Sequence, residues 1–318
     1  MSSHKVNTVT LAAWLFAAMT APLAQIAAGE SWLFVLAVGI ICSVLCWFIH
    51  FLSDGECYHA KWYCRVQLIF LAVAAGIVAN WTVPCWPTGN AFPVVPLVLL
   101  ALAGAAAWNG AERASRTGGV VFWFVALLYA IILAAGVKNL HVGWMEPQWE
   151  IGNTMLVFVF LIPVAALFLP REKGNGHFAV LPAVLFFGAA AALLTAGALS
   201  PEVAKKMAFP FYEYSKSLSL LGVAERFEAF VSVALTMGYF SLLSLFLSGA
   251  WHLAEEIRTG CGRGGILFCS AVAAISLVFL PDILVQWLPS AALAFWGVIP
   301  FVAYAAQKIK VKKDEKIA

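Results

Sequence analysis

The chain has 318 residues, of which 63% are hydrophobic and only 11% are charged, and its mean hydropathy is +0.91. A soluble domain carries more than twice this share of charged residues, so the composition excludes an ordinary soluble protein and predicts one largely embedded in lipid. The net charge of +3 is too small to indicate nucleic-acid binding.

Apolar stretches of about 20 residues, long enough to cross a bilayer as helices, recur along the whole chain. We predict ten spans, at 8–28, 31–51, 62–80, 92–108, 118–137, 151–169, 178–199, 222–251, 264–280 and 285–306. The connections between them are mostly short and polar, and no stretch has the composition of a soluble domain. The predicted fold is therefore an all-α polytopic membrane protein with a single transmembrane domain over residues 1–318.

The lysines and arginines predict the orientation in the membrane. Fourteen of the 19 fall on the side that holds both termini and only five on the opposite side. Because basic residues favour cytoplasmic connections, we expect both termini to be cytoplasmic. The basic tail at 307–318 is interpreted as a topology anchor with weak contacts to membrane lipid.

The segment at 205–221, on the predicted outer side, is too polar to cross the bilayer and too apolar for a free loop. With Pro210 in a first helical turn, four apolar side chains share one face, and this pattern predicts a helix lying in the membrane interface. These side chains are Phe211, Tyr214, Leu218 and Leu221. The charged residues Glu213, Lys216, Glu225, Arg226 and Glu228 then precede or begin the eighth span, where they fit either an ordinary helix cap or a docking surface for a partner.

Three sequence features together resemble the spore germination permeases. The first is Pro210, Glu213 and Lys216 followed by the segment 225–229. The second is the spacing of Gly110, Glu112 and Arg116 between the fourth and fifth spans, and the third is the opening hairpin with its acidic-to-Trp step at residues 30–32. This family supplies the integral B subunit of nutrient germinant receptors and belongs to the amino acid–polyamine–organocation transporter superfamily.

The resemblance implies a five-plus-five inverted repeat, with repeat one at 8–137 and repeat two at 151–306, in which the first helix of each repeat is interrupted near the midplane. It also implies a nutrient ligand such as an amino acid, partner A and C subunits, and a location in the spore inner membrane. The expected ligand-binding residues are Met19, Thr20, Ala21, Pro22, Gln25, Phe160, Pro163, Tyr239 and Ser244.

The predicted spans contain no Asp, Glu, Lys or Arg well inside the bilayer. Because proton-driven transporters commonly need such a residue, this pattern favours sensing over uphill transport. A stand-alone amino-acid transporter of the same superfamily and a scaffold subunit that binds nothing remain as alternatives. We find no nucleophile–base pair, cofactor motif or metal-ligand spacing, so neither an enzyme nor a cofactor is predicted.

Overall fold

The computed structural model describes residues 8–26, 29–52, 60–85, 94–146, 180–207, 209–216, 218, 228–279, 291, 294–302 and 305. The sixth predicted span at 151–169 and the basic tail lie outside these residues.

The described residues are helical, with no strand among them, and helices occupy eight of the ten predicted spans. The main helices are α1 (Thr8–Ile26), α2 (Trp32–Leu52), α3 (Lys61–Asn80), α4 (Val94–Ala107), α5 (Ala111–Gly136), α8 (Val180–Leu199), α9 (Pro201–Lys206), α10 (Pro210–Lys216), α11 (Glu228–Ile257) and α12 (Gly262–Phe279). Short 3-10 turns lie at Val83–Cys85, Val137–Asn139 and Val142–Trp144, and a π-helical turn at Ala294–Val298 lies in the tenth predicted span.

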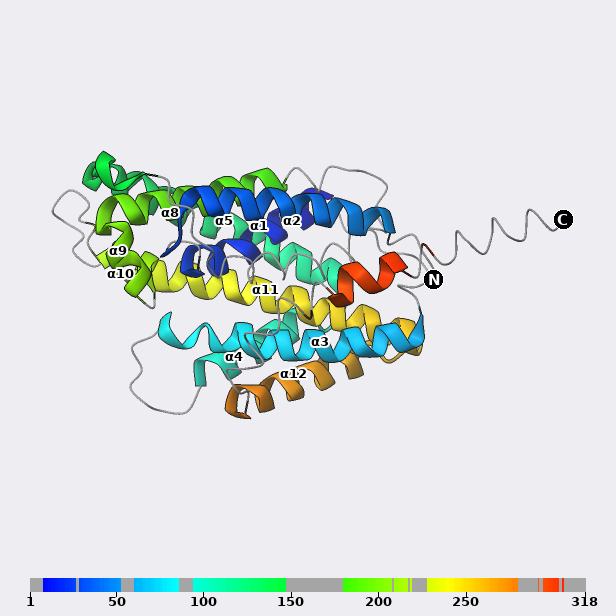
Figure 1. Ribbon diagram of the computed structural model, residues 1–318. Helices are drawn as coiled ribbons and strands as arrows, with labels where there is room; N and C mark the ends of the chain where they lie inside the picture. Colours follow the sequence, from blue (N-terminus) through cyan, green and yellow to red (C-terminus); the bar gives the residue numbers. More distant parts are fainter. Residues whose placement is uncertain are drawn as a thin grey trace.

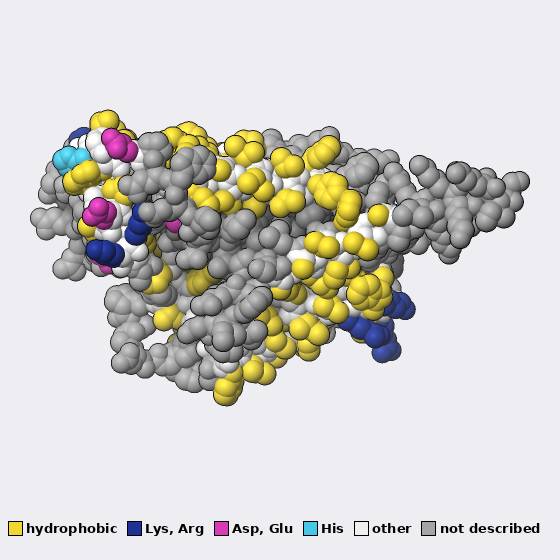
Figure 2. All heavy atoms as spheres, viewed as in Figure 1, with side chains coloured by type: hydrophobic (Ala, Val, Ile, Leu, Met, Phe, Trp, Pro, Cys, Tyr) yellow, Lys and Arg dark blue, Asp and Glu magenta, His cyan; other side chains and the backbone are white. Residues whose placement is uncertain are grey.

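Four of these helices, α3, α5, α8 and α11, are long and apolar enough to cross a membrane, and α1, α2, α4 and α12 contain shorter apolar helical stretches. Figure 1 shows them as an elongated bundle with α9 and α10 at one end. Apolar side chains cover the flank of the bundle in Figure 2, whereas the charged side chains visible in that view gather toward its ends. This distribution is the one expected where hydrocarbon surrounds the flank and water meets the ends.

Helix α11 is the centre of the bundle, because it packs against α1, α3, α4, α5 and α12. All ten residues at 241–250 are buried, so this helix meets protein on every side along that stretch. Small residues allow the close approach. A Cβ atom on Gly238 of α11 would lie 2.5 Å from the Cβ of Ala21 and 3.1 Å from the carbonyl oxygen of Ala17, both on α1. Such contacts are typical of helices that associate in lipid, where packing replaces the hydrophobic driving force.

The predicted interruption of the first span is wrong. Helix α1 runs without a break from Thr8 to Ile26, with Pro22 inside it. A proline lacks the N–H that would bond the carbonyl four residues earlier, here that of Ala18. The Thr20 hydroxyl donates to the Ala17 carbonyl at 2.9 Å in the same turn, and the tight packing on α11 holds this turn in place. Neighbouring helices and Ser/Thr hydroxyls can keep a proline-containing membrane helix continuous in this way.

The predicted interfacial helix at 205–221 takes a different form, because the chain makes two short helices, α9 and α10, with a turn between them. Helix α10 begins at Pro210, as the sequence predicts. Phe211, Tyr214 and Leu218 are buried, so the predicted apolar face is confirmed for these three residues.

The turn before α5 depends on glycine at position 110. Gly110 has φ 92° and ψ 176°, a conformation that side-chain-bearing residues avoid, and it lies against the Trp251 ring. We expect Gly110→Ala to lower the free energy of unfolding by about 1–2 kcal/mol, measured by thermal or denaturant unfolding in detergent. Gly264→Ala is the control, because this helical position has nothing within 4 Å of the added methyl group. Equal stability losses in the two variants would contradict this explanation.

Candidate functional site

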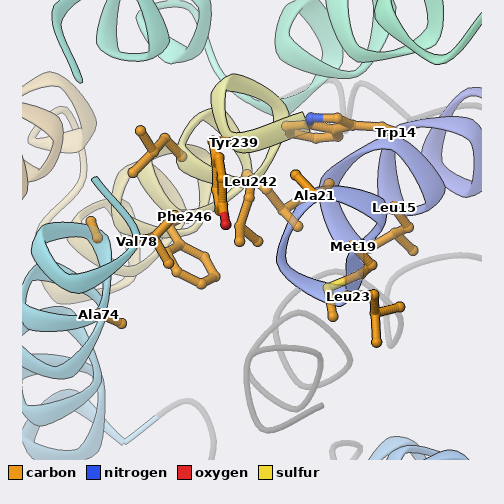
Figure 3. Close-up of a cluster of buried hydrophobic side chains, with 14 of the residues drawn as sticks. Trp14, Leu15, Met19, Ala21, Leu23, Ala74, Val78, Tyr239, Leu242 and Phe246 are labelled. Carbon is orange, nitrogen blue, oxygen red and sulfur yellow. The ribbon is translucent and has the colours of Figure 1, made fainter. Parts of the chain in front are cut away.

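A polar cluster lies inside the bundle near the C-terminal end of α1. The Tyr239 hydroxyl of α11 donates to Oε1 of Gln25 on α1, and Nε2 of Gln25 donates to the carbonyl oxygen of Trp81 at 3.3 Å. Tyr239 is fully buried and Gln25 is 6% exposed. Figure 3 shows Tyr239 projecting from α11 into the space beside α1, among Ala21 and Leu242. Three segments far apart in the sequence are thus joined by one chain of hydrogen bonds.

A small hollow borders this cluster. Its lining comes from α1, the turn after α3, α10 and α11. The lining residues are Gln25, Cys85, Phe209, Phe211, Tyr212 and Leu235. Aromatic rings supply half of this lining, so the hollow offers apolar walls beside the Gln25 amide.

Tyr129 of α5 extends the polar cluster. Its hydroxyl is buried with no hydrogen-bond partner, and it lies within electrostatic range of the Cys85 thiol, as does Tyr239. The Tyr129 ring packs edge-on to Phe187 at 4.7 Å and against Phe211 at 5.9 Å between ring centroids. A buried hydroxyl without a partner costs free energy, so this position favours a polar group that completes its hydrogen bonding.

The cluster is electrically neutral. No Asp, Glu, Lys or Arg is buried among the described residues. Burial raises the pKa of the Cys85 thiol from the ordinary 9.0 to about 12, so the thiol stays protonated at neutral pH. No group of three or more His, Cys, Asp or Glu side chains in the described part of the chain is placed to hold a metal ion. The cluster can therefore exchange hydrogen bonds with a ligand but supplies no counter-charge.

The structure brings together two of the predicted ligand-binding residues, Gln25 and Tyr239. Four others lie within the uninterrupted helix α1 and are buried there: Met19, Thr20, Ala21 and Pro22. The predicted Ser244 belongs to a separate contact, in which its hydroxyl donates to the Ser241 carbonyl at 2.8 Å and accepts from the Trp14 indole N–H at 3.1 Å. Phe160 and Pro163 lie outside the described residues.

The predicted docking residues are described only in part. Glu213 is half-buried on α10. Lys216 and Glu228 belong to α10 and α11, but their side chains, like Glu225 and Arg226, lie outside the described set. The sequence reasoning missed Trp81, Cys85 and Tyr129. Cys85 had no motif around it, and the role of Trp81 uses its backbone carbonyl, which no side-chain pattern reveals.

The arrangement of the helices is similar to that of a solved membrane transporter. The structure is similar to that of Mhp1, a nucleobase-cation-symport-1 family transporter in a closed conformation with bromovinylhydantoin bound. The TM-score is 0.55 at 12% sequence identity, and the match covers 93% of this chain and 77% of Mhp1. No protein-family model matches the sequence, and no curated protein matches it either. The likeness therefore establishes the fold.

The two buried tyrosines provide a matched test of the hydrogen-bond network. We expect Tyr239→Phe to lower the free energy of unfolding by about 1–3 kcal/mol, because Oε1 of Gln25 then loses its buried donor. Tyr129→Phe removes a hydroxyl that has no partner, so stability should stay equal or rise. Unfolding of both variants in the same detergent gives the comparison. A larger loss for Tyr129→Phe would show that the bonding is assigned wrongly.

Proposed function

We propose that the chain is a receptor subunit that senses a small nutrient through a transporter-type fold, as the B subunit of a germinant receptor does. One observation carries the proposal: a neutral polar cluster, Gln25 with Tyr239, is buried beside a small aromatic hollow in a bundle whose described residues bury no charge. Buried polar groups next to a hollow are typical of small-molecule sites. No Asp, Glu, Lys or Arg is buried in the part of the chain that the structure describes, and this favours sensing over proton-coupled uptake.

The Gln25–Tyr239 cluster is suited to the side chain of an amino acid but not to its charged groups. Amide and hydroxyl groups suit the uncharged side chain of a nutrient, whereas a buried ammonium or carboxylate needs a counter-charge or the end of a helix. Because α1 is continuous, it has no half-helix end to offer at its centre. The proposal therefore assigns the nutrient side chain to the Gln25–Tyr239 cluster and its charged groups to the predicted break near Phe160 and Pro163.

The proposal includes assembly with A and C subunits in the spore inner membrane. The motif from Pro210 to Glu228 supports it, because its charged residues fall, in the sequence, within α10, within the connection to α11 and at the first residue of α11. Binding that changes the packing of α10 over the hollow would alter this surface, and so a partner that contacts it would respond.

A stand-alone transporter is the second candidate, and the similarity to Mhp1 favours it. Mhp1 was solved with a small ligand, bromovinylhydantoin, in a closed conformation. A transporter would move its ligand across the membrane without any partner subunit, which separates the two candidates experimentally.

Ligand-dependent stabilisation tests the site. We expect one or more of the twenty amino acids to raise the melting temperature of the purified chain in lipid nanodiscs, and Gln25→Ala to weaken that ligand's affinity at least tenfold. Gln67→Ala is the matched control, because Gln67 is also fully buried but lies on α3 about 20 Å along the helix from Trp81. Its effect should stay within twofold.

The same chain in liposomes separates the candidate functions. Stabilisation without uptake of radiolabelled ligand supports a receptor, and uptake supports a transporter. A chain that neither binds nor transports any amino acid would contradict both and support the scaffold alternative.

A further inference from the structure

Two connections meet at the end of the bundle opposite α9 and α10 (Figure 1): one joins α4 to α5, and the other joins α11 to α12. The Trp251 ring of α11 touches both. A Cβ atom on Gly110 would lie 3.8 Å from this ring, and one on Gly262 would lie 2.4 Å from its Nε1. Arg263 of α12 places its guanidinium carbon 5.7 Å from the centre of the ring of Trp108, which directly follows α4. The two connections therefore form one fixed surface.

Two arginines on this surface carry positive charges that no described carboxylate neutralises. Arg258 and Arg263 are both exposed, and neither forms an ion pair with any residue that the structure describes. The nearby Glu255 carboxylate is engaged within the turn, because it accepts the backbone N–H groups of Gly260 and Gly262, each at 2.9 Å. The other described carboxylates at this end also have partners: Glu112, which pairs with Arg116, and Glu256. The two guanidinium groups are thus available to an anion from outside the chain.

The face of α12 that begins at Arg263 is otherwise apolar and exposed. Side chains four residues apart are neighbours on a helix surface, and every fourth residue after Arg263 is apolar and exposed. These residues are Leu267, Ala271, Ile275 and Phe279. From Arg263 to Phe279 the stripe is about 24 Å long, more than the roughly 15 Å from the edge of the hydrocarbon core to its middle. One face of the helix thus has the length and polarity of a phospholipid, with a charged end and an apolar body.

The indole rings indicate the depth of this surface in the membrane. Trp108 and Trp251 are half-buried at the end of the bundle, and tryptophan is enriched where the lipid headgroups lie. Because the Arg263 guanidinium lies over the Trp108 ring, it is at the same depth, and the cation–π contact restricts its motion. Such preorganisation lowers the entropic cost of binding an anion.

We infer that this surface binds an anionic phospholipid, with its phosphate at Arg263, an acyl chain along the α12 stripe, and further attraction from Arg258 across the turn. The distribution of basic residues predicts this end to be cytoplasmic, and the cytoplasmic leaflet is the one that carries anionic lipids. Figure 2 shows hydrophobic side chains along the flank where α12 lies, and Lys and Arg side chains at its end with no Asp or Glu beside them in that view. The inference does not depend on what the Gln25–Tyr239 cluster binds.

Native mass spectrometry of the full chain in a neutral detergent tests the site, with phosphatidylglycerol and phosphatidylcholine of the same acyl chains as probes. We expect phosphatidylglycerol to bind at least fivefold more tightly, because a basic residue near the membrane surface contributes roughly fivefold to the affinity for an anionic lipid. Arg263→Gln should weaken phosphatidylglycerol binding about fivefold, and Arg258→Gln about twofold, because Arg258 acts across the turn. Binding of phosphatidylcholine should not change in either variant. Both side chains are exposed, so the fold should tolerate these changes.

Arg116→Gln is the matched control, because it removes the same charge at the same end of the bundle from a guanidinium that Glu112 already pairs. Its effect should stay within twofold. Glycerol phosphate, which carries the anion without an acyl chain, should bind at least tenfold more weakly than phosphatidylglycerol. Equal binding of the two lipids, a loss in Arg116→Gln as large as that in Arg263→Gln, or binding of glycerol phosphate as tight as that of the lipid would each overturn the inference.

Discussion

Replacing Gly118 by alanine is expected to lower the free energy of unfolding by about 3 kcal/mol or more. A Cβ atom on Gly118 of α5 would lie inside the Trp14 indole of α1, 2.8 Å from Nε1 and nearer still to two ring carbons. The indole cannot yield by a rotation, because it is fully buried and its N–H donates at 3.1 Å to both the Ser241 carbonyl and the Ser244 hydroxyl. Overpacking alone costs about 1–3 kcal/mol, and displacing the ring adds a lost buried hydrogen bond.

Gly119→Ala is the control for this prediction. It adds the same methyl group one residue later, where the nearest atom is the Thr10 methyl at 3.9 Å. Unfolding in detergent should show a large loss for Gly118→Ala and a loss below about 0.5 kcal/mol for Gly119→Ala. In a Trp14→Ala background the Gly118→Ala penalty should nearly vanish, because the two side chains occupy the same space. A penalty unchanged by removal of the indole would refute the packing explanation.

The sequence was most informative about the helices that cross the membrane. Hydropathy alone predicts α3 at 62–80 and the structure has Lys61–Asn80, because a span must be apolar along its whole length to enter lipid. It was least informative about α1. Pro22 predicts an interruption by a local rule, but continuity depends on tertiary contacts, with Gly238 of α11 packed on Ala21 and the Thr20 hydroxyl on the Ala17 carbonyl. No local pattern reports contacts of this kind.

The candidate site shows the same division between local and tertiary information. Gln25 and Tyr239 are 214 residues apart, and the sequence analysis grouped them because the resemblance implies that spans one and eight share a cavity. Tyr129 and Cys85 joined the cluster only in the structure, since one is a single tyrosine in an apolar helix and the other a single cysteine in a turn. Their proximity depends on how α5, α10 and the turn after α3 meet.

Replacing Gly136 by alanine is expected to raise the alkylation rate of Cys85 at pH 8 by up to about 1,000-fold. The Tyr214 side chain of α10 lies directly on Gly136, so that a Cβ there would be 2.6 Å from the ring carbon Cζ. The ring must leave, and α10, which also carries Phe211 and Tyr212 of the hollow beside Cys85, must move with it. The thiol is then exposed to water, and its pKa falls from about 12 toward the ordinary 9.0.

The direction of this effect follows from how the alkylation rate of Cys85 depends on pH. Alkylation requires the thiolate, so the rate in the native protein should rise about tenfold per pH unit up to pH 11. In Gly136→Ala it should level off above about pH 9, because there the thiol is already ionised. Reaction with iodoacetamide, followed by mass spectrometry of the Cys85 peptide, measures both profiles. Gly143→Ala, with nothing within 4 Å of its added methyl group, should react like the native chain. A Cys85 that stays unreactive in Gly136→Ala would show that α10 does not cover this hollow, and the proposed link between the site and a partner-binding surface would be lost.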